Sequence, residues 1–97
     1  MRLRYTADAL AHLSSIRDFL IERNPAVARR ILADIRGAAS RLCEFPELGR
    51  SSDWPDTREW VVQRTPYISV YQVERARDEV TVLGVFHGSQ DWQGSRP

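Results

Sequence analysis

Residues 57–87 constrain the fold more than any other stretch because they consist almost entirely of strand-forming sequence. They divide into three runs rich in β-branched and aromatic side chains, separated at Pro66 and at a charged segment, residues 74–78. The third run, residues 80–86, is apolar at successive positions, which predicts an interior strand with both faces covered. Three consecutive strands predict a meander, and its apolar face needs a second layer to pack against.

The first half of the chain supplies that layer as two predicted helices. Between Ala7 and Arg23 the apolar residues recur at helical spacing, and Thr6 is a suitable N-cap. Pro25 suits a first helical position, so a second helix is expected from there to about Cys43. The short connection predicts an antiparallel helical hairpin. The apolar positions are Leu10, Leu13, Ile16 and Leu20 in the first helix and Ala28, Ile31, Ile35, Ala38 and Leu42 in the second.

The remaining segments complete the predicted fold. Residues 2–5 alternate and predict an edge strand, whereas residues 46–56 are rich in Pro, Ser and Gly and predict a connecting loop. The predicted fold class is therefore α+β in the order β-α-α-β-β-β. An N-terminal strand and an antiparallel two-helix hairpin pack on a mostly antiparallel sheet of about four strands, in a single domain over residues 1–97.

The amino-acid composition indicates the class of protein and its cellular location, but it indicates little about function. Of the 97 residues, 42% are hydrophobic and 28% are charged, as in an ordinary globular protein. No apolar run is long enough to span a membrane, and the single Cys43 excludes an internal disulfide, so a cytoplasmic protein without membrane contact is expected. Every basic side chain is Arg, which suits bidentate contacts to phosphate or carboxylate or reflects codon use in a GC-rich genome. The formal charge of +1 gives no prediction of nucleic-acid binding.

Metal and cofactor chemistry find no support in the sequence. His12 and His87 lie far apart, without the spacing of metal ligands, and no Gly-rich phosphate-binding motif is present. His12 sits beside the apolar stripe of the first helix and is expected at the surface. Cys43 ends a helix, where the dipole disfavours a thiolate. The expectation is no metal, no cofactor and no cysteine nucleophile.

One group of side chains could carry chemistry. Arg58 and Arg64 lie an even number of residues apart on a predicted strand, so both can point to one side of the sheet. Tyr67 opens the next strand and His87 closes the last. This group could hold an RNA phosphate while the imidazole moves a proton, or it could bind an acidic protein partner. The same residue types also fit solvated strand ends.

Two further sets of side chains are candidates for partner contacts. Asp91 and Trp92 lie in the tail, which we expect to be a functional surface, with the carboxylate pairing an arginine of the sheet; the alternative is that Trp92 plugs the open end of the core. Phe19 and Ile21 flank the stripe of the first helix, and Leu32 flanks that of the second. These three predict an apolar strip that a second protein chain covers.

Several segments, in this order and spacing, resemble the RelE/ParE superfamily, the toxin halves of bacterial type II toxin–antitoxin pairs. They are the opening YTADALAHLSSIRDFL, then FPELGR, TREWVV, PYISVYQV and the ending VFHGSQDW. The last three are similar to the ParE-type branch. The resemblance implies a helical hairpin on a mostly antiparallel sheet. It also implies a cognate antitoxin that wraps an extended arm and a helix around the toxin.

The two branches of the superfamily differ in mechanism. RelE-type members cut mRNA on the ribosome with basic residues on the sheet, whereas ParE-type members poison DNA gyrase. Ile68 stands where RelE-type nucleases carry Arg, and Gly84 stands where ParE-type relatives often carry Arg. A sheet without these cations is poorly equipped to stabilise a phosphorane-like transition state.

The resulting hypothesis is a ParE-like toxin that inhibits DNA gyrase by binding and is neutralised by an antitoxin. The first alternative is a ribosome-dependent mRNA endonuclease, and the second is a non-toxic member that keeps only antitoxin binding. Target-binding candidates are Arg58, Arg64, His87, Asp91 and Trp92. The endonuclease alternative uses Arg58, Arg64, Tyr67 and His87. The antitoxin-binding candidates are Phe19, Ile21 and Leu32.

Overall fold

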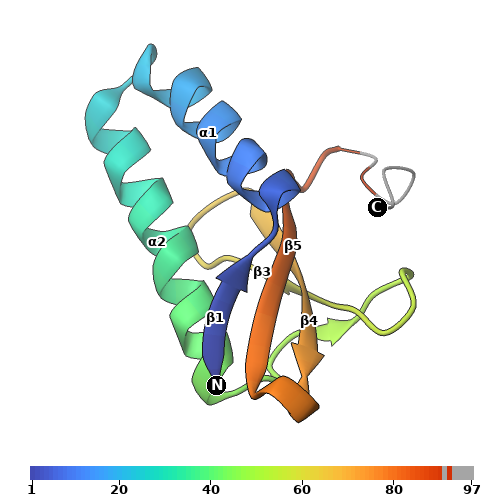
Figure 1. Ribbon diagram of the computed structural model, residues 1–97. Coiled ribbons are helices and arrows are strands. Elements are labelled where there is room, and N and C mark those ends of the chain that lie inside the picture. The colour runs from blue at the N-terminus through green and yellow to red at the C-terminus, as the bar shows by residue number, and fades with distance from the viewer. Residues whose placement is uncertain (91, 93–97) are drawn as a thin grey trace.

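The computed structural model describes residues 1–90 and residue 92, and it confirms an α+β fold with the predicted elements in the predicted order, to which one short strand is added (Figure 1). Both α-helices cover one face of the sheet, while the loop before β3 and residues 88–90 lie on the other side. No helix in the described part of the chain is both long and apolar enough to cross a membrane. The elements are β1 (Arg2–Tyr5), α1 (Ala7–Ile21), α2 (Pro25–Glu44), β2 (Arg50–Ser51), β3 (Arg58–Val61), β4 (Tyr67–Glu74), the short helix η1 (Arg75–Arg77) and β5 (Glu79–His87).

The sheet is mixed and has five strands in the order β1-β5-β4-β3-β2. β1 is an edge strand that pairs in parallel with β5, and the other neighbours are antiparallel. The expectation of about four strands is corrected to five because the predicted loop 46–56 contains β2, whose two residues pair with β3. Two residues are too few to show the alternation that identifies a strand in sequence. β5 is interior, as its apolar sequence predicts.

Local capping sets where the helices begin and end. The Thr6 hydroxyl accepts a hydrogen bond from the Ala9 N–H at 3.1 Å, and the Asn24 side chain accepts one from the Val27 N–H at 3.2 Å. Pro25 occupies the first position of α2, as predicted. α1 ends at Ile21, slightly earlier than expected. The result is the predicted hairpin of two helices joined by a very short turn.

A β-bulge in β5 changes which side chains face the helices. The register shifts between Val70 and Tyr71 of β4, which pair with Gly84 and Val82 and leave Leu83 as an extra residue. The alternation of side chains therefore reverses within β5. Val82 before the bulge and Val85 after it both reach the helices, while Phe86 turns to the opposite face.

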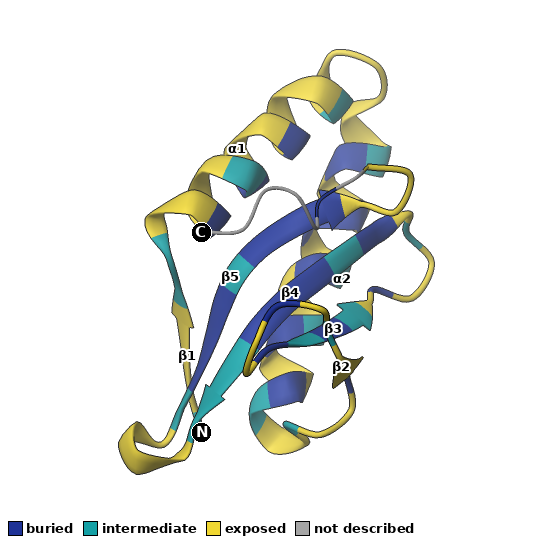
Figure 2. Cartoon of the chain, turned by 90° about the vertical axis from the view of Figure 1, so that its right-hand side faces the viewer, coloured by how far each residue is buried: buried dark blue, intermediate teal, exposed yellow. Residues whose placement is uncertain are grey.

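The larger core lies between the sheet and the helical hairpin, where dark-blue segments of both layers meet (Figure 2). We call it the helix-side core. One prediction for it is wrong: Leu10 is 53% exposed, because Ala9 takes the buried position at the start of α1. The helix-side core consists of Ala9, Leu13, Ile16, Ile31, Leu32, Ile35, Ala39, Leu42, Val62, Tyr67, Tyr71, Val80, Val82 and Val85.

Candidate functional site

The face of the sheet opposite the helices, which we call the outer sheet face, is covered by three aromatic side chains. Trp54 comes from the loop before β3, Phe86 from β5 and Trp92 from the tail, and we call these three the aromatic stack. The rings of Phe86 and Trp92 are stacked, with centroids 5.5 Å apart and planes tilted by 16°. Trp54 meets them edge-on at 6.0 and 5.3 Å. Each side chain is at most 3% exposed, so the stack forms a second small core.

The prediction that Trp92 belongs to an exposed functional surface is wrong. Its side chain is 2% exposed and packs with Phe86 and Trp54, so the alternative of a core plug is correct. Burying a large apolar ring stabilises the folded chain, whereas leaving it exposed at a chain end does not. Asp91, the other candidate in the tail, lies outside the described residues.

Gly84 and His12 complete the surroundings of the stack. A Cβ at position 84 would lie 2.6 Å from the Phe86 ring, so only glycine lets that ring lie flat over β5. The His12 ring contacts Phe86 at 4.8 Å, and its Nδ1 accepts a hydrogen bond from the Val85 N–H at 3.2 Å. His12 is thus half-buried and hydrogen-bonded, rather than the simple surface residue expected from the sequence. It satisfies a backbone donor of β5 beyond the end of β1.

Arg58 is held by the backbone of the preceding loop. Its Nη1 donates to the Gly49 carbonyl at 2.7 Å, and the same loop is bound by Tyr71, whose hydroxyl donates to the Pro46 carbonyl at 2.6 Å. The Tyr71 hydroxyl also accepts from the Gly49 N–H at 2.9 Å. Burial raises the pKa of Tyr71 above its ordinary value, against the smaller opposing effects of the Gly49 hydrogen bond and of Arg58. Arg58 therefore stabilises a loop.

The sequence predicted that Arg58 and Arg64 share a strand. In the structure they do not. β3 ends at Val61, and Arg64 lies in the following turn with a φ of 65°, where even spacing no longer fixes the direction of a side chain. Its Nη2 pairs with the Asp34 carboxylate of α2 at 3.1 Å. The two arginines therefore contact different elements and form no common anion site.

Tyr67 and His87 do lie together, directly opposite each other in the register of β4 and β5. Their rings meet edge-on at 5.5 Å. His87 is exposed, and its Nδ1 accepts a hydrogen bond from the Ser89 N–H at 3.1 Å. Burial raises the pKa of Tyr67, so its hydroxyl is a poor proton donor at neutral pH. The four residues of the endonuclease alternative thus fall into three separate places.

The centre of the outer sheet face is apolar. Ile68 and Leu83 pack against the aromatic stack together with the fully buried Val70. The neighbouring Glu59 is 7% exposed and its carboxylate is paired with Arg50 at 2.5 Å. In the described part of the chain no group of three or more His, Cys, Asp or Glu side chains could hold a metal ion. The centre of this face is therefore a closed apolar cluster, and the charge of the neighbouring Glu59 is neutralised by Arg50.

The helical hairpin exposes two of the three candidate antitoxin contacts. Phe19 is 53% exposed with the Arg23 guanidinium 3.7 Å over its ring, and Ile21 is 48% exposed. Leu32 is 8% exposed and packs in the helix-side core, so its assignment to an exposed strip is wrong. Phe19 and Ile21 flank the buried stripe of α1 at the surface, whereas the flanking leucine of α2 packs inside the helix-side core.

Sequence reasoning missed Trp54 and the contacts of His12. Trp54 lies in a segment without periodicity, and its only signal was a tryptophan in an otherwise polar loop. The partner of His12 lies 73 residues away in sequence, so nothing local could identify it.

A family model of the ParE toxin of the type II toxin-antitoxin system, parDE, matches residues 3–92 of the chain. A putative toxin, Y4kP of Sinorhizobium fredii (strain NBRC 101917 / NGR234), is 36% identical over 91 residues, which cover 94% of this chain and 92% of that protein. Toxin RelE2 of Caulobacter vibrioides is 39% identical over 69 residues, covering 71% of this chain and 76% of the relative.

Solved structures show the same architecture. A chain of the chromosomal ParDE TA system from P. aeruginosa superposes with a TM-score of 0.78 at 26% identity, covering 90% of this chain and 95% of that one. The intact E. coli RelBE toxin-antitoxin complex gives a TM-score of 0.62 at 18% identity, covering 89% and 94% of the two chains. The second likeness concerns the fold alone.

Proposed function

This chain belongs to the ParE toxin family of type II toxin–antitoxin systems, and from that premise we propose that it arrests growth by binding DNA gyrase. The observation that carries a binding mechanism is the apolar outer sheet face. The aromatic stack closes this face as a buried cluster, and Ile68 and Leu83 stay partly exposed beside it. Among the described residues, the centre of this closed face presents apolar surface and no cation, which favours contact with a protein over contact with a phosphate backbone.

The positions of the candidate catalytic side chains support the same choice. Phosphoryl transfer needs preorganised cations and a proton donor around one phosphate. Arg58 is bound to a loop carbonyl and Arg64 to a carboxylate of α2. Only Tyr67 and His87 remain adjacent; burial raises the pKa of the Tyr67 phenol, and neither arginine of the candidate set lies with them.

Gyrase contact on this proposal uses the exposed members of the candidate set. The Arg64 side chain is 72% exposed and His87 is exposed at the end of β5. Arg58 presents only part of its guanidinium, since one Nη donates to the Gly49 carbonyl. Asp91 stays a predicted contact, whereas Trp92 acts by supporting the face from within.

A cognate antitoxin is the second partner we propose. Phe19 and Ile21 leave apolar surface on α1 that an isolated chain gains nothing from exposing. The P. aeruginosa relative is described as part of a ParDE toxin–antitoxin system, which supports a similar pairing here. Purified with its antitoxin, the toxin is expected to be more soluble and to melt at a higher temperature than alone. Equal behaviour of the free and paired forms would contradict this assignment.

Induced expression in bacterial cells tests the choice between the two mechanisms. Gyrase poisoning is expected to stop DNA replication and raise an SOS reporter while mRNA stays intact. The endonuclease alternative, which the Tyr67–His87 contact favours most, predicts early loss of mRNA and of translation without the SOS response. A chain that causes neither effect at matched expression would be a non-toxic member.

The variant His87→Ala separates the two mechanisms further. General acid–base catalysis supplies about 10²–10⁴ in rate, so loss of the imidazole abolishes toxicity only if proton transfer is the mechanism. On the binding proposal the variant still arrests growth. Complete loss of arrest, with circular dichroism unchanged and antitoxin binding retained, would count against gyrase binding as the mechanism.

A further inference from the structure

A cavity of about 500 Å³ lies between α1 and the C-terminal end of β5, two elements that lie side by side (Figure 2). We call it the two-histidine cavity, because His12 of α1 and His87 of β5 both line it. Its apolar surface includes the side chains of Ile16, Phe19 and Tyr67. Small-molecule sites have volumes of roughly 300–1,000 Å³ and are mostly apolar, with a few polar groups that orient the ligand. The two-histidine cavity has this size and this composition.

The backbone of β5 at the two-histidine cavity already has hydrogen-bond partners. In the described sheet β1 pairs with β5 only as far as Val82, so the rest of β5 has no strand beside it there. The Val85 N–H donates instead to His12 Nδ1 at 3.2 Å, and the His87 N–H donates to Gln90 Oε1 at 3.3 Å. A further strand would have to displace both side chains. The cavity therefore suits a compact ligand rather than an added strand.

Backbone hydrogen bonds also define the tautomer of both imidazoles. The Val85 N–H donates to His12 Nδ1, and the Ser89 N–H donates to His87 Nδ1 at 3.1 Å. Because a backbone N–H can only donate, neither Nδ1 carries a proton. Each neutral ring therefore has its proton on Nε2. The Ser89 hydroxyl supports this tautomer at His87, with its Oγ 2.7 Å from Nδ1.

The two Nε2–H groups are available as hydrogen-bond donors to a ligand. Among the described residues neither has a partner. A metal ion does not suit these rings, because a metal-bound imidazole donates through its other nitrogen, and here that nitrogen accepts. In the described part of the chain no third metal-binding side chain joins them either. The ligand must therefore supply a hydrogen-bond acceptor.

The two-histidine cavity favours an uncharged acceptor over a carboxylate. Among the described residues that line it, none carries a formal charge while both imidazoles are neutral. Moving a carboxylate out of water without a cation to pair with it is unfavourable. A ketone or amide oxygen avoids this cost and still satisfies a buried donor.

We propose that the two-histidine cavity binds a small, uncharged aromatic molecule that bears a carbonyl group. Its ring packs against Phe19, Ile16 and Tyr67, since aromatic rings pack favourably on one another. Its carbonyl oxygen accepts a hydrogen bond from Nε2–H of His87, the more exposed of the two imidazoles. His12 offers a second donor from α1. The inference does not depend on the identity of the toxin's target.

The tautomers are tested first, by long-range ¹H–¹⁵N NMR spectra of the full-length protein at pH 8. Both rings are expected to show an unprotonated Nδ1 and a protonated Nε2. A proton on Nδ1 of either His12 or His87 would overturn the proposal, because the donors would then point to the backbone instead of the ligand.

Three probes of similar size test the class of ligand: acetophenone, α-methylstyrene, in which a CH₂ group replaces the carbonyl oxygen, and benzoate. Each is titrated into the full-length protein while the NMR signals of the His87 and Phe19 rings are followed. Acetophenone is expected to bind at least about ten-fold more tightly than α-methylstyrene, which leaves the imidazole donor without an acceptor. It is expected to bind several-fold more tightly than benzoate, whose charge must be desolvated. No saturable binding of acetophenone, or equal or tighter binding of either control, would overturn the proposal.

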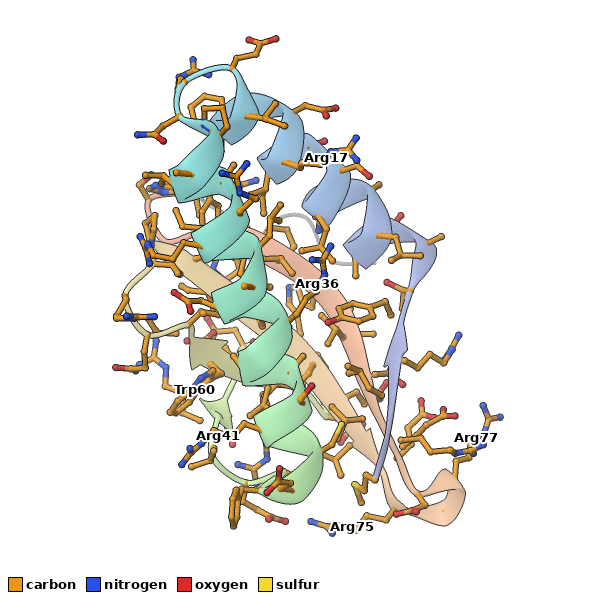
Figure 3. All side chains as sticks on the ribbon, turned by 90° about the vertical axis from the view of Figure 1, so that its left-hand side faces the viewer. Arg17, Arg36, Arg41, Trp60, Arg75 and Arg77 are labelled. Carbon is orange, nitrogen blue, oxygen red and sulfur yellow. The ribbon has the colours of Figure 1, made fainter. Side chains whose placement is uncertain are left out.

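Ser15→Leu tests the place of binding. Ser15 lines the two-histidine cavity from an exposed position of α1, and leucine is the better helix former, so the fold should stay intact. Ser14→Leu is the matched control. Ser14 lines a separate hollow between the helices, together with Arg17 of α1 and Arg36 of α2, which Figure 3 labels. Acetophenone affinity should fall at least about ten-fold in Ser15→Leu and stay unchanged in Ser14→Leu. Equal affinity in the two variants would overturn the proposal.

His87→Asn tests the hydrogen bond itself. The asparagine oxygen replaces Nδ1 as an acceptor for the Ser89 N–H, while the Nε2–H donor is lost. The affinity for acetophenone is expected to fall at least about ten-fold, whereas that for α-methylstyrene should not change. Unchanged acetophenone affinity, or an equal loss for both probes, would overturn the assignment of His87 as the donor.

Discussion

The helix-side core and the aromatic stack are both buried, yet they are built in different ways. The helix-side core is mostly aliphatic, and its side chains come from helices and strands with regular spacing, apart from Val62, which directly follows β3. The stack takes one side chain each from a loop, a strand and the tail: Trp54, Phe86 and Trp92. Its members contact one another through rings 5.3–6.0 Å apart rather than through interdigitated aliphatic chains.

The difference shows how one sheet can have two unlike faces. Helices can cover only one face here, because the chain offers two and they form a hairpin. The other face would expose Ile68 and Val70 unless something covered it, and three large rings do so with few residues.

The largest expected effect comes from removing one ring or one aliphatic side chain from each core. Trp54→Ala is expected to lower the free energy of unfolding by about 3–5 kcal/mol, and Ile35→Ala in the helix-side core by about 2–5 kcal/mol. Both side chains are at most 3% exposed, so each leaves a cavity. Urea unfolding monitored by far-UV circular dichroism measures the two losses.

Near-UV circular dichroism distinguishes the two variants. The signal from the edge-on contact of Trp54 with Trp92 should be lost in Trp54→Ala and kept in Ile35→Ala. A Trp54→Ala protein with wild-type stability would mean that the stack is a covering rather than a core, and the comparison of two cores would then fail.

Tyr71→Phe tests whether the loop that carries Trp54 is stabilised by its hydrogen bonds to Tyr71, whose side chain lies in the helix-side core. The hydroxyl donates to Pro46 and accepts from Gly49, so its loss leaves two backbone groups without partners. We expect a loss of about 1–3 kcal/mol in urea unfolding. Tyr5→Phe is the matched control, because the buried Tyr5 hydroxyl has no hydrogen-bond partner among the described residues, and this variant should unfold like wild type. A smaller loss for Tyr71→Phe than for Tyr5→Phe would contradict the assignment.

Alkaline pH should destabilise the protein through the same tyrosines. Burial raises the pKa of Tyr5, Tyr67 and Tyr71 above the ordinary value of 10.0, so the folded state holds their protons more tightly than the unfolded chain. This stability is fully present below pH 10 and is lost as the pH rises through the folded-state pKa values. Each tyrosine that titrates only in the unfolded chain contributes a slope of about 1.4 kcal/mol per pH unit. Urea midpoints between pH 8 and 11 measure it, and Tyr71→Phe should flatten the slope.

The sequence predicted the elements that form the helix-side core better than it predicted the aromatic stack. The Thr6 cap, the start of α2 at Pro25 and the interior position of β5 depend on local spacing, and all three are confirmed. The bulge at Leu83 depends on pairing with β4, which no local pattern specifies. Trp54 joins the stack only once the loop is folded, so its role could not be predicted from residue spacing.

The candidate site was predicted less well than the fold, for a physical reason. Even spacing placed Arg58 and Arg64 on one side of the sheet only as long as the strand continued. β3 ends at Val61, and the turn that follows gives Arg64 a positive φ. His87 and Tyr67 were correctly placed at strand ends, because the antiparallel pairing of two long strands determines which ends meet.

Alanine substitutions at two glycines are expected to change the stability of the protein by smaller amounts and in opposite directions. Gly84→Ala puts a Cβ 2.6 Å from the Phe86 ring, so the ring must tilt away from Trp92. Overpacking costs about 1–3 kcal/mol and the gain of alanine over glycine in a strand offsets part of it, so the net loss should be about 1 kcal/mol. Gly37→Ala has open space and is expected to gain up to about 1 kcal/mol. Thermal unfolding compares the two, and a gain in both variants would show that the stack adapts freely.

Arg64→Ala is expected to have the smallest effect on stability and belongs to neither core. The ion pair with Asp34 has its arginine 72% exposed, and exposed pairs contribute about 0–1 kcal/mol. Asp34 keeps Arg30 as a partner at 3.0 Å, so the carboxylate is not left unpaired. A reduced growth arrest at unchanged Tm would therefore assign Arg64 to the contact with gyrase. Unchanged arrest would remove it from the target-binding set, and a large fall in Tm would mean that the turn after β3 depends on the pair far more than its exposure indicates.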